Sequence, residues 1–268
     1  MPIMSRLRRT IRGAGAGLCL AALVPAGGVL AQDFQDKGFY QSYVFGTPDE
    51  PSEAWLLAYG GRLYDMWWAV LFADPPQRTH PAYPKEGAAS GSETWRCVEC
   101  HGWDYRGKDG AYGVGPHHTG IKGISAMAGA DPNRIAAIVR DPKHGYTVDM
   151  IPDAALNALA LFVSKGQVDD DKVIDRATGR VHGDPARGKP IFQNVCAICH
   201  DYDGMAWITG DDDDLQTLGA IANANPWRGL HKVMNGQTYA DMPAMRAFDL
   251  QTVLDILAYA QTLPQRQQ

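Results

Sequence analysis

Apolar side chains recur at helical spacing near the C-terminal end of the chain. The stretch DLQTVLDILAYAQTLP (249–264) carries Leu254, Leu257 and Ala258 at such a spacing, so we expect a helix there. An aromatic-rich stretch, YDMWWAVLF (64–72), shows the same spacing. Its rings are therefore expected to pack inside the molecule rather than to form a docking face.

A further helix is expected at DPARGKPIFQNV (184–195), where an aspartate is placed to cap the first turn. The segment before this helix, SKGQVDDDKVIDRATGRVHG, is charged and contains glycine, which is typical of a connection between domains. We place the boundary near Thr178. The predicted domains are therefore 32–178 and 179–268.

The first residues differ from the rest of the chain. MPIMSRLRRTIRG has four arginines and no acid. The stretch that follows is uncharged and ends in small residues. This layout predicts a signal peptide at 1–31, cut after Ala31, and so a periplasmic protein. The alternative is an uncleaved membrane anchor, which Pro25 and several glycines disfavour and whose length is marginal for a bilayer.

Removal of this leader makes the chain more acidic. The full chain has 25 Lys and Arg against 30 Asp and Glu, and without the four leader arginines the count is 21 against 30, a formal charge of −9. Such a protein is not suited to nucleic acid, but it suits redox partner proteins with basic docking surfaces. No later run predicts a membrane span, and the aspartate runs 169–171 and 211–214 are expected to be solvated loops.

Four of the five cysteines belong to two copies of one motif, Cys-x-x-Cys-His. The fifth, Cys19, lies in the predicted leader, so the mature chain has no cysteine outside the motifs. The motif residues are Cys97, Cys100 and His101 in the first copy and Cys196, Cys199 and His200 in the second.

Several chemistries could use such pairs of cysteines. Local disulfides suit an exported protein, two pairs could hold a zinc ion, and a thioredoxin-like redox pair is a third option. None of these explains a histidine directly after each pair. Covalent haem does, because two thiols add across the two porphyrin vinyl groups and the next imidazole reaches the iron when the segment begins a helical turn. We therefore predict two covalently bound haem c groups, each with an iron.

With these motifs the chain resembles class I cytochromes c, twice over. The resemblance implies an all-α fold of two tandem cytochrome c-like domains, each wrapped round a covalently attached haem, with an extra N-terminal helical segment. In that family a short helix leads into the motif. A methionine, usually before a proline, is the second axial ligand of the iron and precedes a last helix.

The second copy follows the family pattern closely. Gly188 and Phe192 stand four residues apart and resemble the family's glycine and aromatic pair, where the glycine lets two helices cross closely. Ile256 and Tyr259 resemble the pair that packs on this first helix. Met242, followed by a proline and 42 residues after the histidine, is the implied axial ligand.

The first copy departs from the pattern, because positions 89 and 93 are alanine and glutamate. The missing helix is expected earlier, at SEAWLLAYGGRLYDMWWAVLF (52–72), with Gly60 and Tyr64 as the matching pair. The proline-rich stretch 73–92 would then be an insertion between that helix and the motif.

The rest of the first copy again matches the family. Met150, 49 residues after His101 and two before a proline, is the implied axial ligand. GVGPHHTGIKGI (113–124) resembles a family segment whose proline carbonyl accepts a hydrogen bond from the iron-bound imidazole, a role that falls to Pro116.

Other side chains compete as axial ligands of each iron. Met127 competes with Met150, and Met234 and Met245 compete with Met242; the nearby prolines favour Met150 and Met242. The remaining histidines are interpreted as surface or hydrogen-bonding residues: His117, His118, His144, His182 and His231.

The resemblance implies a periplasmic dihaem electron carrier that is not an enzyme, since an iron held by histidine and methionine is closed to substrates. One alternative is a haem subunit bound tightly to a periplasmic oxidoreductase through residues 32–92. The other is a dihaem enzyme acting on a small sulfur compound or peroxide. Similarity to thiosulfate dehydrogenases is weak, because their active haem takes a cysteine ligand and none is spare here.

Overall fold

The computed structural model describes residues 47–206 and 216–265, which belong to one compact unit, Gln41–Gln268. The predicted leader 1–31 and the aspartate run 211–214 lie outside the described residues. Within the described part the regular structure is helical, with isolated β-bridges and no strand. None of the described helices is both long and apolar enough to cross a membrane.

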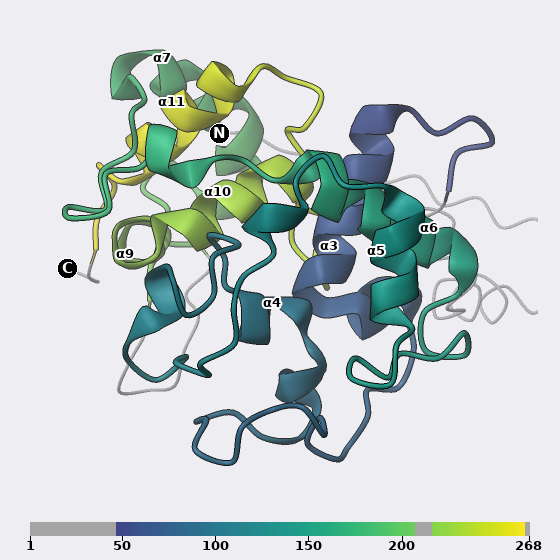
Figure 1. Cartoon of the computed structure of the whole chain (residues 1–268). Coiled ribbons are helices and arrows are strands. Elements are labelled where there is room, and N and C mark those ends of the chain that lie inside the picture. Colours follow the sequence, from purple (N-terminus) through teal and green to yellow (C-terminus); the bar gives the residue numbers. More distant parts are fainter. Residues whose placement is uncertain (1–46, 207–215, 266–268) are drawn as a thin grey trace, which may run out of the picture. The chain divides into compact units, whose positions relative to one another are not determined.

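The helices fall into two sets along the chain (Figure 1). Short 3-10 or π-helical turns, labelled η, separate or extend them. The first set is α3 (Glu53–Leu71), η1 (Gly91–Trp95), α4 (Cys97–His101), η2 (Ala111–Gly113), η3 (Ser125–Met127), α5 (Pro132–Val139), α6 (Asp153–Leu161), η4 (Phe162–Gly166) and η5 (Asp170–Lys172). The second set is α7 (Pro185–Ile191), η6 (Phe192–Cys196), α8 (Ala197–His200), α9 (Leu218–Ala224), α10 (Pro226–Asn235) and α11 (Leu250–Ala260).

In the first set, α3 packs across α6 and η4 (Figure 1). The contact is so close at Gly60 that a Cβ atom there would lie 2.2 Å from the carbonyl oxygen of Ala158. One turn later the Tyr64 ring meets Phe162, with 5.7 Å between ring centroids. The prediction of a helix at 52–72, with a glycine and an aromatic ring at a helix crossing, is confirmed.

In the second set, α7 packs against α11 in the same way. A Cβ atom at Gly188 would lie 1.9 Å from the carbonyl oxygen of Asp255, and the Phe192 and Tyr259 rings are 5.3 Å apart. Asp184 caps α7 by accepting a hydrogen bond from a backbone N–H of its first turn. The predicted helices at 184–195 and 249–264 are therefore confirmed.

Each set of helices has a hydrophobic core of its own. The first core is built from residues between Leu63 and Val163, and the second from residues between Ile174 and Ala260. Trp227 of α10 packs against both, and α10 also contacts α3. The predicted boundary at Thr178 lies in the turn beside the second core and stays a prediction, because both cores belong to one compact unit.

We expect Gly188→Val to destabilise the protein by about 3 kcal/mol, because the new side chain would push the α7 and α11 backbones apart. Ala186→Val is the matched control: Ala186 is exposed on the same helix, so only helix propensity changes, by about 0.5 kcal/mol. Denaturant unfolding of both variants measures the difference. Equal losses in the two variants would contradict the close crossing.

Candidate haem sites

The first Cys-x-x-Cys-His motif forms the short helix α4, as the haem hypothesis requires. Two hydrogen bonds from α3 hold its ends. The Tyr64 hydroxyl donates to the carbonyl of Gly102 at 2.7 Å, and the Trp67 indole N–H donates to the carbonyl of Trp95 at 3.1 Å. Helix α3 thus positions the motif although the inserted loop separates the two in sequence.

All four motif cysteines are free thiols. Burial raises the pKa of Cys97 and of Cys100 to about 12, and that of Cys196 to about 11, so these thiols are protonated at neutral pH. The four motif cysteines thus form no local disulfides. The described residues include all four of these cysteines. Among the described residues no group of three or more His, Cys, Asp or Glu is placed to hold a metal ion, so the two pairs are not arranged as a zinc site.

The proximal imidazole of the first motif is oriented by a carbonyl. Nδ1 of His101 lies 2.8 Å from the carbonyl oxygen of Lys122, whereas Pro116 is exposed. The hydrogen bond expected at Pro116 is therefore made at Lys122. The cause is the β-bridge between Gly107 and Lys122, which returns the loop to the motif six residues beyond the proline.

The same imidazole is neutral. Burial lowers the pKa of His101 to about 4, so the ring carries one proton at neutral pH. With that proton on Nδ1 and donated to Lys122, Nε2 keeps a lone pair for a metal. A ring with this tautomer, next to two free thiols on one helical turn, fits a covalently attached haem.

The second motif continues the helix that crosses α11. Helix α7 runs through η6, which contains Cys196, into α8, which contains Cys199 and His200. Burial lowers the pKa of His200, so this ring is also neutral and can offer a lone pair. Its Nδ1 is buried without a hydrogen-bond partner in the described part of the chain. These residues fit a second haem.

The methionines considered as axial ligands lie in different surroundings. Met150 and Met127 are partly buried against the first core. Met234 and Met245 are buried within the second core. Met242 lies between α10 and α11 and is only partly buried. Axial ligation by Met150 and by Met242 stays a prediction.

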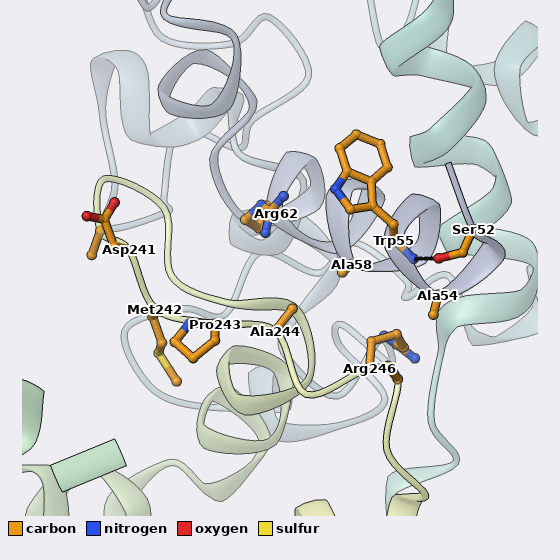
Figure 2. Close-up of a pocket in the computed structure, with 12 residues that line it drawn as sticks. Ser52, Ala54, Trp55, Ala58, Arg62, Asp241, Met242, Pro243, Ala244 and Arg246 are labelled. Atoms are coloured by element: carbon orange, nitrogen blue, oxygen red, sulfur yellow. Dashed lines mark hydrogen bonds between the residues drawn. The ribbon is translucent and has the colours of Figure 1, made fainter. Parts of the chain in front are cut away.

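Met242 also lines a surface pocket of about 670 Å³ (Figure 2). Trp55 and Arg62 of α3 form one side of this pocket, and Met242, Pro243, Ala244 and Arg246 form the other. The Met242 side chain extends away from the labelled Trp55 and Arg62 in Figure 2. The pocket is thus bordered by the loop that carries Met242, without enclosing its sulfur.

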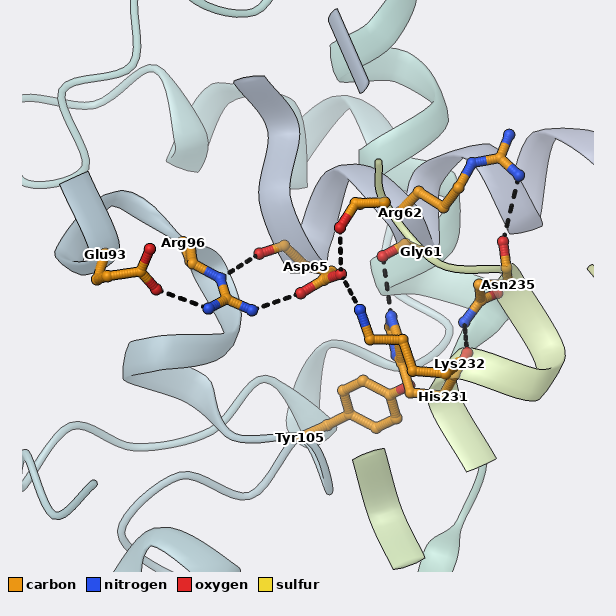
Figure 3. Close-up of polar contacts among 10 residues, drawn as sticks. Gly61, Arg62, Asp65, Glu93, Arg96, Tyr105, His231, Lys232 and Asn235 are labelled. Carbon is orange, nitrogen blue, oxygen red and sulfur yellow. Dashed lines mark hydrogen bonds and ion pairs between the residues drawn. The ribbon is translucent and has the colours of Figure 1, made fainter. Parts of the chain in front are cut away.

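A buried ion network joins the first motif to α10 (Figure 3). The Asp65 carboxylate, almost fully buried, pairs with Arg96 at 2.6 Å and with Lys232 and also accepts a hydrogen bond from Thr238 at 3.1 Å. Burial would raise the pKa of Asp65, but Lys232 and Arg96 outweigh it and lower this pKa to about 2. Because Arg96 directly precedes Cys97, the network fixes the start of the motif.

His231 forms the second part of the contact between the first motif and α10. Its Nε2 donates to the carbonyl of Gly61 at 2.9 Å, and its Nδ1 accepts from the Tyr105 hydroxyl at 2.8 Å (Figure 3). Burial lowers the pKa of His231 to about 3, so the ring is neutral. The prediction that His231 is a hydrogen-bonding residue rather than a ligand agrees with these contacts. No sequence pattern linked it to Gly61 or to Tyr105.

Comparison with known proteins identifies part of the chain. Residues 183–259 match the family described as "Cytochrome C oxidase, cbb3-type, subunit III". No match was found among curated proteins. This segment is therefore a c-type cytochrome domain, which implies covalently bound haem and haem-based electron transfer.

We expect the protein to lose stability in acid through His231. Its pKa is about 3 when folded and 6.5 in its ordinary state, so the unfolded chain binds more protons between these values. Stability is therefore complete above about pH 6.5 and falls by about 1.4 kcal/mol per pH unit toward pH 3. Denaturant unfolding of the haem-loaded protein at about pH 7 and about pH 5 measures this slope.

His231→Gln should reduce that slope, since glutamine can still donate to Gly61 but does not titrate. His182→Gln is the control, because His182 is exposed. An unchanged slope in His231→Gln would show that other groups dominate the acid response.

Proposed function

We propose that the chain is a periplasmic dihaem c-type cytochrome that passes single electrons between redox partners. The observation that carries this proposal is the repeat of one arrangement in both halves. In each half a helix glycine crosses a later helix, at Gly60 and at Gly188, and an aromatic ring follows one turn on. Both arrangements lead to a Cys-x-x-Cys-His motif, and the cytochrome family match covers the motif of the second half.

The residues that would hold the two haems follow from this repeat. Cys97 and Cys100 would supply the thiols in the first half, and His101 would bind the iron. In the second half Cys196 and Cys199 would supply the thiols, and His200 and Met242 would bind the iron. A haem iron cycles between the ferric and ferrous states and so accepts and releases one electron at a time.

The chain's own residues prepare the sites for this role. Nδ1–H of His101 donates to Lys122, which fixes the ring orientation and raises the basicity of the other nitrogen. Burial keeps His101 and His200 neutral, so neither ring must lose a proton before it binds iron at neutral pH. The ion network at Asp65 and Arg96 holds the first motif firmly, which limits movement when the charge on the site changes.

The second motif is open to partners. Ile198, between the two cysteines, has 80% of its surface exposed. Covalent attachment at Cys196 and Cys199 would bring one edge of the haem to this surface. An apolar contact there, surrounded by the acidic mature chain, suits a partner with a basic docking surface. Export through the predicted signal peptide 1–31 would place this exchange in the periplasm.

Two haems per chain are expected when the protein is made in a host with c-type haem maturation. A pyridine haemochrome assay per mole of chain counts them. Replacing Cys97 and Cys100 together by alanine should leave one haem, and so should replacing Cys196 and Cys199 together. Cys19→Ala is the control and should leave two. One haem in the unaltered protein, unaffected by loss of Cys97 and Cys100, would contradict the dihaem proposal.

A further inference from the structure

A second imidazole faces the first haem motif. The ring centroids of His101 and His144 are 6.3 Å apart, and the ring planes differ by 28°. His144 comes from the loop between α5 and α6, so the two rings approach from different parts of the chain. The two ring planes are therefore close to parallel, and no hydrogen bond joins the two imidazoles.

Both rings are oriented in the way that metal-binding histidines are. Nδ1 of His101 lies 2.8 Å from the Lys122 carbonyl, and Nδ1 of His144 lies 3.1 Å from the Asp141 carboxylate. These acceptors keep the proton on Nδ1 and leave Nε2 with its lone pair. Within the described residues, no hydrogen bond is made at Nε2 of either ring.

The separation matches one metal ion between two imidazole nitrogens. Half of 6.3 Å is ~3.2 Å, and the distance from an imidazole centroid to Nε2 is ~1.1 Å, which leaves ~2 Å for each bond. Bonds between imidazole nitrogen and a metal have about this length. The separation of the two rings is therefore long enough to hold an iron between His101 and His144, and the proposed ligation requires that both Nε2 atoms face it.

The backbone on both sides of His144 is held in place. His80 accepts a hydrogen bond from a backbone N–H at Nδ1, so its Nε2 carries the proton and donates to the carbonyl of His144 at 2.8 Å. The Tyr146 hydroxyl donates to the carbonyl of Trp95 at 2.8 Å. Arg140 donates to the carbonyl of Thr147 at 2.6 Å. This loop thus presents His144 in a fixed position, as a ligand residue requires.

Met150 has no comparable arrangement. Its backbone N–H donates to the carbonyl of Thr147 at 3.2 Å, and its side chain packs against the first core. We propose that His101 and His144 are the two axial ligands of the first haem, in place of the pair His101 and Met150. This inference rests on the proposed function, since it requires a haem at the first motif.

The consequence is a difference between the two haems. A methionine ligand raises the potential of haem iron relative to a second histidine. The first haem would then be the stronger reductant and the second, held by His200 and Met242, the stronger oxidant. Electrons would enter near the first motif and leave near the second.

The test uses the far-red absorption band that a methionine–iron bond gives in the oxidised holoprotein. The unaltered protein should show this band at the strength of one haem, and Met150→Leu should leave it unchanged. His144→Ala should convert half of the haem to a high-spin form in electron paramagnetic resonance, and added imidazole should restore the low-spin form. His144→Met should double the band and raise the lower of the two midpoint potentials. His182→Ala is the control and should change neither signal.

Other results would overturn the inference. A band at two-haem strength that Met150→Leu halves would assign Met150, and a fully low-spin His144→Ala protein would assign another ligand. If His144→Ala does not load haem, the strength of the far-red band in the unaltered protein and in Met150→Leu still decides between His144 and Met150 as the ligand. The haem count separates this inference from the proposed function: one haem per chain that survives the loss of Cys97 and Cys100 contradicts both, whereas two haems with a two-haem band contradict only the His144 ligand.

Discussion

The structure depends on two places where helix backbones touch. At Gly60 and at Gly188 a carbonyl oxygen occupies the space of a Cβ atom, so each crossing excludes any side chain. The position of the haem motifs follows from these crossings. One turn after Gly60, Tyr64 donates its hydrogen bond to the residue that follows His101, and the helix of Gly188 runs on directly into the second motif. Close backbone contact therefore determines where each imidazole and each pair of thiols lie.

The contact between the first motif and α10 is of a different physical kind from these helix crossings. Asp65, Arg96 and Lys232 lose water on folding, which is costly unless the charges are paired. His231 adds two hydrogen bonds in the same region and remains neutral. Such a network contributes more to a specific arrangement than to net stability, because each charge needs all of its partners. It ties the first motif to α10 and would so help to keep the two proposed redox sites in fixed positions.

The sequence predicted those features that depend on nearby residues. Helical spacing and the glycine and aromatic pairs identified α3, α7 and α11 because i and i+4 share a helix face. The hydrogen bond to His101 was assigned to Pro116 instead of Lys122, because the bridge that brings Lys122 back joins segments distant in sequence. The contact between the first motif and α10 had no sequence signal either, because its residues are also distant in sequence. Its members are spread from Asp65 to Thr238 and meet only after folding.

Under the proposed function, the inserted loop would allow two similar halves to hold haems with different ligands. Only the first half has this loop between its crossing helix and its motif, and the loop supplies His80, whose ring binds the carbonyl of His144. His80 is buried against Trp95, next to the motif, with ring centroids 4.3 Å apart. The insertion thus connects the motif to the segment that carries His144 and holds that imidazole opposite His101. Two haem sites with the axial ligands proposed above would differ in potential, and this difference would give electron flow through the chain a direction.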